Sequence, residues 1–166
     1  TRTRRQRQMC IRDRFGTNID NVFSQFSQPI AAASIAQVHF AKIKSSNTEI
    51  DVAVKVLRPE IEKIINQEME RLEWLTTFME NFTEFQRLRP NSIIKKAKEV
   101  IKFELDLRYE AAAASELSEN TNMDESFYVP KVYWDKVTQK ILTMEKIIGV
   151  PCLLYTSDAA DEFSCV

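Results

Sequence analysis

Three stretches in the first third of the chain have the hydrophobic and polar pattern of strands. Residues 22–29 lead into a run of alanines, and residues 35–43 alternate apolar and polar positions with a period of two. Residues 49–57 follow a polar turn and place four apolar side chains on one face: Ile50, Val52, Val54 and Val56. Because side chains alternate along a strand, the pattern predicts Lys55 on the opposite face, next to Ala53.

The middle of the chain has helical periodicity. Pro59 suits the first turn of a helix, and apolar residues recur at steps of three and four as far as Phe82. This predicts an amphipathic helix of about 23 residues. Its apolar stripe could face a partner, a lipid surface or the sheet, and we favour packing in the core. A second stripe, in a segment rich in helix-forming residues, predicts one continuous helix from about Pro90 to Glu119.

The last part of the chain returns to strand patterns. Residues 127–134 and 140–147 predict a closing pair of strands joined by a turn. The predicted order is three strands, two long helices and two strands. Short strands with hairpin connections favour an α+β fold, in which a five-stranded antiparallel sheet carries helices on one side.

Composition excludes several kinds of site. The 166 residues include two glycines, too few for a Walker A loop or a GxGxxG turn, which need several positions without a Cβ atom. One histidine and three cysteines at positions 10, 152 and 165 give none of the spacings of a zinc site. No window approaches the roughly 18 consecutive apolar residues of a membrane span, so we expect a soluble or peripheral chain.

The two ends of the chain are related at the level of DNA. Residues 4–13 back-translate to CGT CGG CAG CGT CAG ATG TGT ATA AGA GAC; with AG added, the reverse complement encodes residues 152–161 in one frame. A sequencing adapter read in both directions explains this relation, and a natural protein gives no reason for it. We therefore expect residues 1–14 and 152–166 to be adapter read-through and residues 15–151 to be the natural segment.

This interpretation changes the charge of the chain. Of 23 basic and 24 acidic residues, the two ends hold six and four, which leaves 17 and 20 and a net charge of −3. The arginine-rich arm disappears with the ends, so no argument for a nucleic-acid partner remains. All three cysteines also lie in the ends, so cysteine content indicates nothing about redox compartment.

Residues 31–38 carry the first candidate chemistry. Their alanines at the first, third and sixth positions and their valine at the eighth match the glycines and the valine of the kinase loop GxGxxGxV. Alanine is small enough to let backbone amides approach a phosphate, and it makes the loop stiffer than glycine does. A run of alanines is more often a tight packing point, so this loop is a weak signal by itself.

The segment Val52-Ala53-Val54-Lys55 strengthens that signal, because it is a close copy of the kinase VAIK strand and falls one hairpin later. In a kinase this lysine reaches the α and β phosphates and is held by a helix carboxylate. The alternative is a solvated lysine on an edge strand.

Candidate carboxylates for that lysine lie in residues 103–110. In a continuous helix, Asp106 and Glu110 share a face, and Glu104 points about 120° away from Glu110. We expect one acidic face to meet Lys55; the alternative is an ordinary charged helix surface.

Five strings of the chain together are similar to one family: PIAAASIAQVHFA, VAVKVLRPEI, FELDLRYEAAAASEL, VPKVYW and ILTMEKIIGVP. They resemble the UbiB family of atypical protein-kinase-like proteins, whose members support ubiquinone biosynthesis. The resemblance covers essentially all of residues 15–151, and the alanine loop and the ExD element in the third string are distinctive of that family. It implies a protein-kinase-like N-lobe, with one helix docked on the sheet and one extra helix.

The resemblance also implies a set of nucleotide contacts. Five residues of the alanine loop and the following strand are expected to line a bound ATP or ADP: Ala31, Ala33, Ser34, Ala36 and Val38. Lys55 is expected to pair with Glu110, which corresponds to the helix glutamate of kinases. Glu145 and Ile147 fall where a kinase hinge meets the adenine.

Glu104 and Asp106 would then form the ExD element, which in the family meets an N-terminal helical element with a KxGQ motif that this sequence does not contain. Ala113 stands where many members have Asn, which puts a polar contact near ExD in doubt. The catalytic loop and the Mg²⁺ ligands are expected beyond Pro151, in a second lobe. The fragment itself is therefore expected to have no catalytic activity.

The resemblance implies that the whole protein acts as an ATPase or small-molecule kinase in quinone synthesis. Its location would be the cytoplasmic face of a bacterial inner membrane or a mitochondrion, with a membrane surface and quinone-biosynthesis proteins as partners. The alternative is a pseudokinase scaffold that contacts membrane or enzymes through helix 61–82; the alanine loop and ExD argue against an ordinary protein kinase. We expect His39 to be structural, and Trp74 and Trp134 to pack in the core or between lobes.

Overall fold

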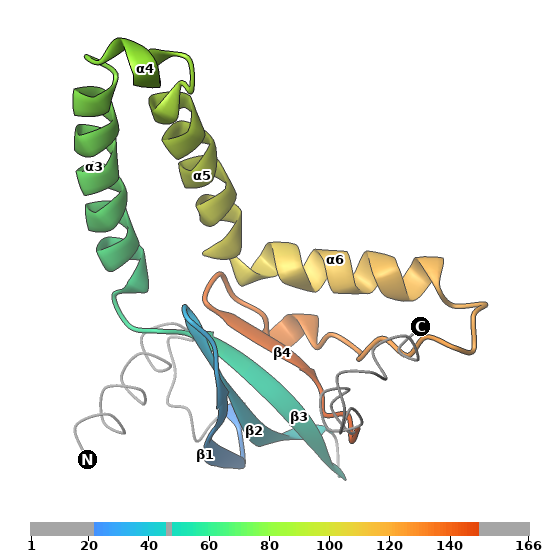
Figure 1. Ribbon diagram of the computed structural model, residues 1–166. Helices are drawn as coiled ribbons and strands as arrows, with labels where there is room; N and C mark the ends of the chain where they lie inside the picture. The colour runs from blue at the N-terminus through green and yellow to red at the C-terminus, as the bar shows by residue number, and fades with distance from the viewer. Residues whose placement is uncertain (1–21, 46–47, 150–166) are drawn as a thin grey trace, which may run out of the picture.

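The computed structural model describes residues 22–45 and 48–149. Within them a four-stranded antiparallel sheet has the order β1-β2-β3-β4, and helices are inserted between β3 and β4 (Figure 1). The strands are β1 (Gln25–Ala32), β2 (Ala36–Ser45), β3 (Thr48–Leu57) and β4 (Ile141–Glu145). The segments expected to be adapter read-through lie outside the described residues, and that expectation stays a prediction.

The first three strands confirm the alternating pattern. β2 and β3 pair in unbroken register from Ala36 opposite Leu57 to Ser45 opposite Thr48. β1 pairs with β2, and the register of this pairing shifts twice, on either side of Pro29. Proline has no N–H for a ladder hydrogen bond. Val52 and Val54 are fully buried on one face, so the predicted valine stripe forms core.

The predicted fifth strand is reduced to one bridge, between Val132 and Met144. Two hydrogen bonds support the bridge, from the Tyr133 N–H to the Thr143 carbonyl at 3.0 Å and from the Glu145 N–H to the Lys131 carbonyl at 2.8 Å. Residue 130 is a proline, which cannot donate to a ladder, and the 3₁₀ helix η1 (Trp134–Lys136) turns the chain directly afterwards. The expectation of five strands is therefore wrong for the described residues, which form four.

Four helices connect β3 to β4: α3 (Ile61–Met79), the short α4 (Thr83–Gln86), α5 (Pro90–Glu104) and α6 (Leu107–Asn120). Figure 1 shows α3 and α5 side by side as a hairpin that projects away from the sheet, whereas α6 runs alongside β4. A side-chain network joins the hairpin, because Thr76 donates to Asn91, and Asn91 donates through its N–H and its amide to the Glu80 carboxylate.

The expectation of one continuous helix from Pro90 to Glu119 is wrong at residues 105–106. Leu105 and Leu107 are both buried in one apolar cluster, but two residues along a helix differ by about 200° in direction. A break between them lets both side chains reach the same core. Asp106 takes an extended conformation there and caps α6, since its carboxylate accepts a hydrogen bond from the Arg108 N–H at 3.1 Å.

The core has two parts, one on each face of the sheet. The first comprises the valine stripe and its neighbours: Phe23, Ala41, Ile43, Val52, Val54, Val56 and Ile141. The second joins the other face to the α5–α6 junction: Ala36, Leu57, Leu105, Leu107, Ala111 and Leu142. The second part therefore fixes α6 against the sheet.

The apolar stripe of α3 does not form core. Ile61 and Ile65 pack near the second cluster, but Leu72, Leu75 and Phe78 are exposed. Trp74 is 72% exposed and Trp134 is 52% exposed, so neither packs in the core of the described residues, and packing against a second lobe stays a prediction. The hairpin projects away from the sheet, which leaves the outer side of α3 with no apolar surface to cover it within residues 48–149.

Ala111 tests the packing of α6, because it is fully buried whereas its neighbour Ala112 is exposed. We expect Ala111→Leu to lower the free energy of unfolding by about 1–3 kcal/mol through overpacking. Chemical denaturation of both variants measures this, with Ala112→Leu as the matched control. Equal stabilities would contradict the close approach of α6.

Asp106 gives a second prediction. Its hydrogen bonds to Arg108 hold the pKa of this carboxyl below its ordinary value. We expect Asp106→Ala to lose about 1 kcal/mol through the missing cap, while Asp106→Asn keeps a capping oxygen and removes only the charge.

A lowered folded pKa stabilises the protein above the unfolded pKa, and that stability is lost as pH falls through the folded pKa. The stability difference between wild type and Asp106→Asn should therefore be full at pH 7 and shrink below the ordinary value of 3.8. Urea denaturation from pH 7 to pH 3 measures it, and a difference independent of pH would overturn the assignment. The stability difference between wild type and Arg108→Gln should depend on pH in the same way, because this change removes the partner of the Asp106 carboxylate.

Candidate functional site

A row of four residues crosses the sheet on one face. The strand registers place Ala31 opposite Val38, Val38 opposite Lys55, and Lys55 opposite Leu142. Directly paired residues point to the same face, so Lys55 lies between Val38 and Leu142 on the side away from the valine stripe. The sequence pattern predicted this orientation of Lys55.

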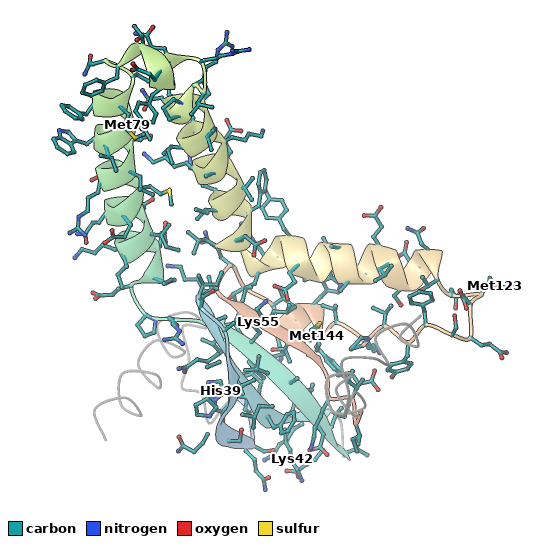
Figure 2. All side chains as sticks on the ribbon, in the orientation of Figure 1. His39, Lys42, Lys55, Met79, Met123 and Met144 are labelled. Atoms are coloured by element: carbon teal, nitrogen blue, oxygen red, sulfur yellow. The ribbon has the colours of Figure 1, made fainter. Side chains whose placement is uncertain are left out.

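Glu110 reaches Lys55 from α6. The Lys55 Nζ donates to Glu110 Oε1 at 2.8 Å and to Oε2 at 2.7 Å, so the ammonium bridges both oxygens. The side chains are 28% and 42% exposed, which leaves the pair open to a ligand. In Figure 2 Lys55 lies on the sheet below the first turn of α6. The next residue, Ala111, belongs to the same buried cluster as Leu142, and this packing holds Glu110 over the strand.

The alanine loop forms a tight turn between β1 and β2. The Ala33 N–H donates to the Ala36 carbonyl at 2.9 Å, which closes the turn. Ala31, Ala33 and Ser34 are exposed. Ala36 is only 1% exposed and packs in the second core cluster, so its methyl group is unavailable to a ligand.

The ExD residues do not join the pair. Asp106 is buried as the cap of α6, and Arg108 donates to it from Nε at 2.9 Å and from Nη2 at 2.6 Å. Glu104 is exposed at the end of α5, on a different helix from Glu110. The expected angle of about 120° between them assumed one helix and therefore does not apply. Of the three predicted carboxylates, the structure brings only Glu110 to Lys55.

The predicted hinge residues lie at the end of β4 and beyond it. Glu145 pairs with Val52, so its side chain points to the face away from Lys55, where its carboxylate accepts the Lys131 N–H at 3.3 Å. A hydrogen bond to the same carboxylate raises the pKa of Tyr128. Ile147 is exposed. Any contact of Glu145 with a ligand beside Lys55 would therefore come from its main chain.

An apolar strip lies beside Lys55; the alternating pattern predicted Ala53 on this face, and sequence reasoning did not single out Phe40. Phe40 pairs with Ala53, and Ala53 pairs with Met144, one alternation along from the row that contains Lys55. All three are partly buried, and the Lys146 Nζ lies 4.4 Å from the centre of the Phe40 ring. Period-two alternation from Lys55 was the signal for Ala53. A half-buried apolar strip beside an ammonium group suits a ligand with a flat ring and an anionic group.

Other candidate sites lie elsewhere. His39 is buried against Phe26, and its Nδ1 lies 3.1 Å from the Ser27 carbonyl, as a structural role requires. A cavity of about 620 Å³ at the base of α3 is lined by Arg58, Glu62 and Lys140 among others, and it includes neither Lys55 nor Glu110. Residues 22–45 and 48–149 contain no cluster of three or more metal-ligating groups, and none of their helices is long and apolar enough to cross a membrane.

Comparison with known proteins agrees with this geometry. Residues 2–162 match the family model of the ABC1 atypical kinase-like domain. Over 143 residues the chain is 41% identical to proteins described as "Probable protein kinase UbiB" from Pseudomonas paraeruginosa and Pseudomonas entomophila, and 39% identical to one from Azotobacter vinelandii. Each alignment covers 85% of this chain and 26% of the relative, so the chain spans about a quarter of these relatives. The chain therefore belongs to the ABC1 atypical kinase-like family, which includes the UbiB proteins that it resembles.

Proposed function

We propose that this domain binds ATP or ADP and supplies the nucleotide-binding half of a UbiB-type atypical kinase or ATPase. The observation that carries the proposal is the bridging contact of Lys55 with Glu110, beside the exposed alanine turn and the apolar strip. These three features offer a cation, backbone groups and a flat apolar surface in one region of the sheet.

The residues present fit the parts of a nucleotide. Lys55 would neutralise charge on the α and β phosphates, and Glu110 would hold the ammonium in place. The exposed backbone of residues 31–34 would face the phosphates, and Val38 and Ala53 would contact the adenine ring. When bound, ATP supplies the phosphoryl group, which a protein of this kind transfers to water or to a small molecule.

The Mg²⁺ ligands and the catalytic base are not among the residues that we assign to this domain. Kinases hold Mg²⁺ with carboxylate and amide groups of the second lobe. We therefore propose that the nucleotide is sandwiched between this domain and a second lobe, and that this domain alone turns nothing over.

The family suggests a role for the whole protein. We propose that it supports ubiquinone biosynthesis at the cytoplasmic face of a bacterial inner membrane, or in a mitochondrion, together with enzymes of that synthesis. The UbiB relatives that match this chain are bacterial, which supports the first location.

Lys55→Ala tests nucleotide binding in the full-length protein. We expect it to weaken ADP binding about tenfold or more, which lowers ligand-induced stabilisation by about 1.4 kcal/mol at saturating ADP. Thermal unfolding with and without ADP measures this effect. Lys44→Ala is the matched control, because Lys44 is an exposed lysine at the far end of β2. Unchanged stabilisation in Lys55→Ala would favour a non-catalytic scaffold.

A scaffold that docks on an anionic membrane is the second candidate, and the outer surface of the hairpin favours it. Trp74, Phe78 and Phe82 form an exposed ladder, with ring centres 6.4 Å and 5.5 Å apart. Residues 74–98 also contain five basic and two acidic side chains, in a chain whose net charge is negative. Exposed aromatic rings on an amphipathic helix are typical of surfaces that lie in a membrane interface, and the excess of basic side chains in this segment would favour anionic lipid.

The ladder gives a fourth prediction. Replacing Trp74, Phe78 and Phe82 together by Ser should reduce cosedimentation of the full-length protein with anionic phospholipid vesicles at least fivefold, because rings buried in the interface drive binding. Leu117→Ser, an exposed apolar change on α6, is the control. If the triple variant cosediments with vesicles as wild type does, membrane docking through the hairpin is wrong, and the ladder would then contact a protein partner.

A further inference from the structure

Arg58 follows β3 directly and contacts the alanine turn at two points. Its N–H donates to the Ile35 carbonyl at 2.9 Å, which extends the β2–β3 ladder by one step. Its side chain reaches back so that Nη2 donates to the Ala33 carbonyl at 3.0 Å. One residue therefore binds two carbonyls of the turn that connects β1 to β2.

The turn has few other restraints. The Ala33 N–H bond to the Ala36 carbonyl closes it, and the buried Ala36 methyl anchors one end. Ala33 and Ser34 are exposed, and no other side-chain hydrogen bond reaches residues 33–36 among the described residues. Because every residue here carries a Cβ, the turn has fewer accessible conformations than a glycine loop, and one added hydrogen bond suffices to select among them.

In this position the guanidinium group leaves one of its donors without a hydrogen bond to any described residue. Its Nε is buried without a hydrogen-bond partner among residues 22–45 and 48–149. An unsatisfied donor on a charged group is unfavourable, so the arrangement is not the one that solvation alone would give. Tertiary structure constrains Arg58 to this pose, and the contact that the pose makes is the one with the turn.

We propose that Arg58 is a positioning residue for the nucleotide phosphates, holding the alanine turn in the conformation that presents its backbone to them. This inference rests on the proposed nucleotide binding. Arg58 itself need not touch the ligand; it acts through the Ala33 carbonyl. From outside the loop, the arginine thus adds a restraint that selects one of the few conformations open to a turn without glycine.

The proposal predicts a difference between ligands with and without phosphates. In the full-length protein, Arg58→Ala should weaken ADP binding about tenfold, which corresponds to one charge-assisted hydrogen bond. Binding of adenosine should change less than twofold, because the ring contacts Val38 and Ala53 rather than the turn. Arg58→Gln keeps a side-chain N–H donor, two bonds nearer the backbone than the guanidinium nitrogens, and should recover only part of the ADP affinity.

Isothermal titration with ADP and adenosine measures the ligand difference, and hydrogen exchange of the residue 33–36 amides without ligand measures order in the turn. Exchange should be faster in Arg58→Ala than in wild type. Arg71→Ala, which removes an exposed arginine paired with Glu68 on α3, is the control for both measurements.

Three results separate the outcomes. Wild type that binds neither ADP nor adenosine would overturn the proposed function and this inference with it. Wild type that binds ADP, with Arg58→Ala binding it equally well, would overturn only the role of Arg58. Equal weakening of ADP and adenosine, together with loss of the folded core, would show that Arg58 is a general structural residue; Arg58→Gln then repeats the comparison in a folded protein.

Discussion

The packing of α6 against β4 is the constraint on which the rest of the site depends. Ala111 and Leu142 are both buried in the cluster that joins these elements, and Glu110 precedes Ala111. Lys55 and Glu110 are 55 residues apart, so no local preference brings them together. A small residue at position 111 lets the helix approach the sheet, and that approach converts a surface carboxylate into the partner of a strand lysine.

The break before α6 makes this packing possible. A straight helix from Pro90 would continue along the axis of α5 toward the sheet instead of turning to run alongside β4, and Leu105 and Leu107 would point in different directions (Figure 1). Asp106 stabilises the break because its carboxylate replaces a missing backbone partner at the start of α6. Asp106 therefore helps to position Glu110 beside Lys55 by stabilising the start of α6, although it does not contact either residue of the pair.

The helical hairpin is a separate part of the molecule. Its base meets the rest of the domain through apolar packing of Ile61 and Ile65 and through the Lys140–Glu62 ion pair. The Thr76–Asn91–Glu80 network and the ion pair of Lys98 with Glu73 at 2.6 Å join the two helices of the hairpin. These contacts use polar groups and leave the aromatic ladder on the outside. The domain thus carries two different surfaces, a polar and apolar face on the sheet around Lys55 and an aromatic face on the hairpin.

The sequence by itself determined the three N-terminal strands, the side of the sheet on which Lys55 lies, and the family, because alternation and short motifs are local properties. Tertiary structure decided the rest. The helical pattern left Asp106 and Glu110 on one acidic face, and the family resemblance implied Glu110; tertiary structure brings Glu110 to Lys55 and uses Asp106 as a helix cap. It also divided one predicted helix into two, reduced the fifth strand to a bridge and exposed the α3 stripe. Each of these outcomes depends on which surfaces meet, and a periodic pattern shows only that a face is apolar, not what covers it.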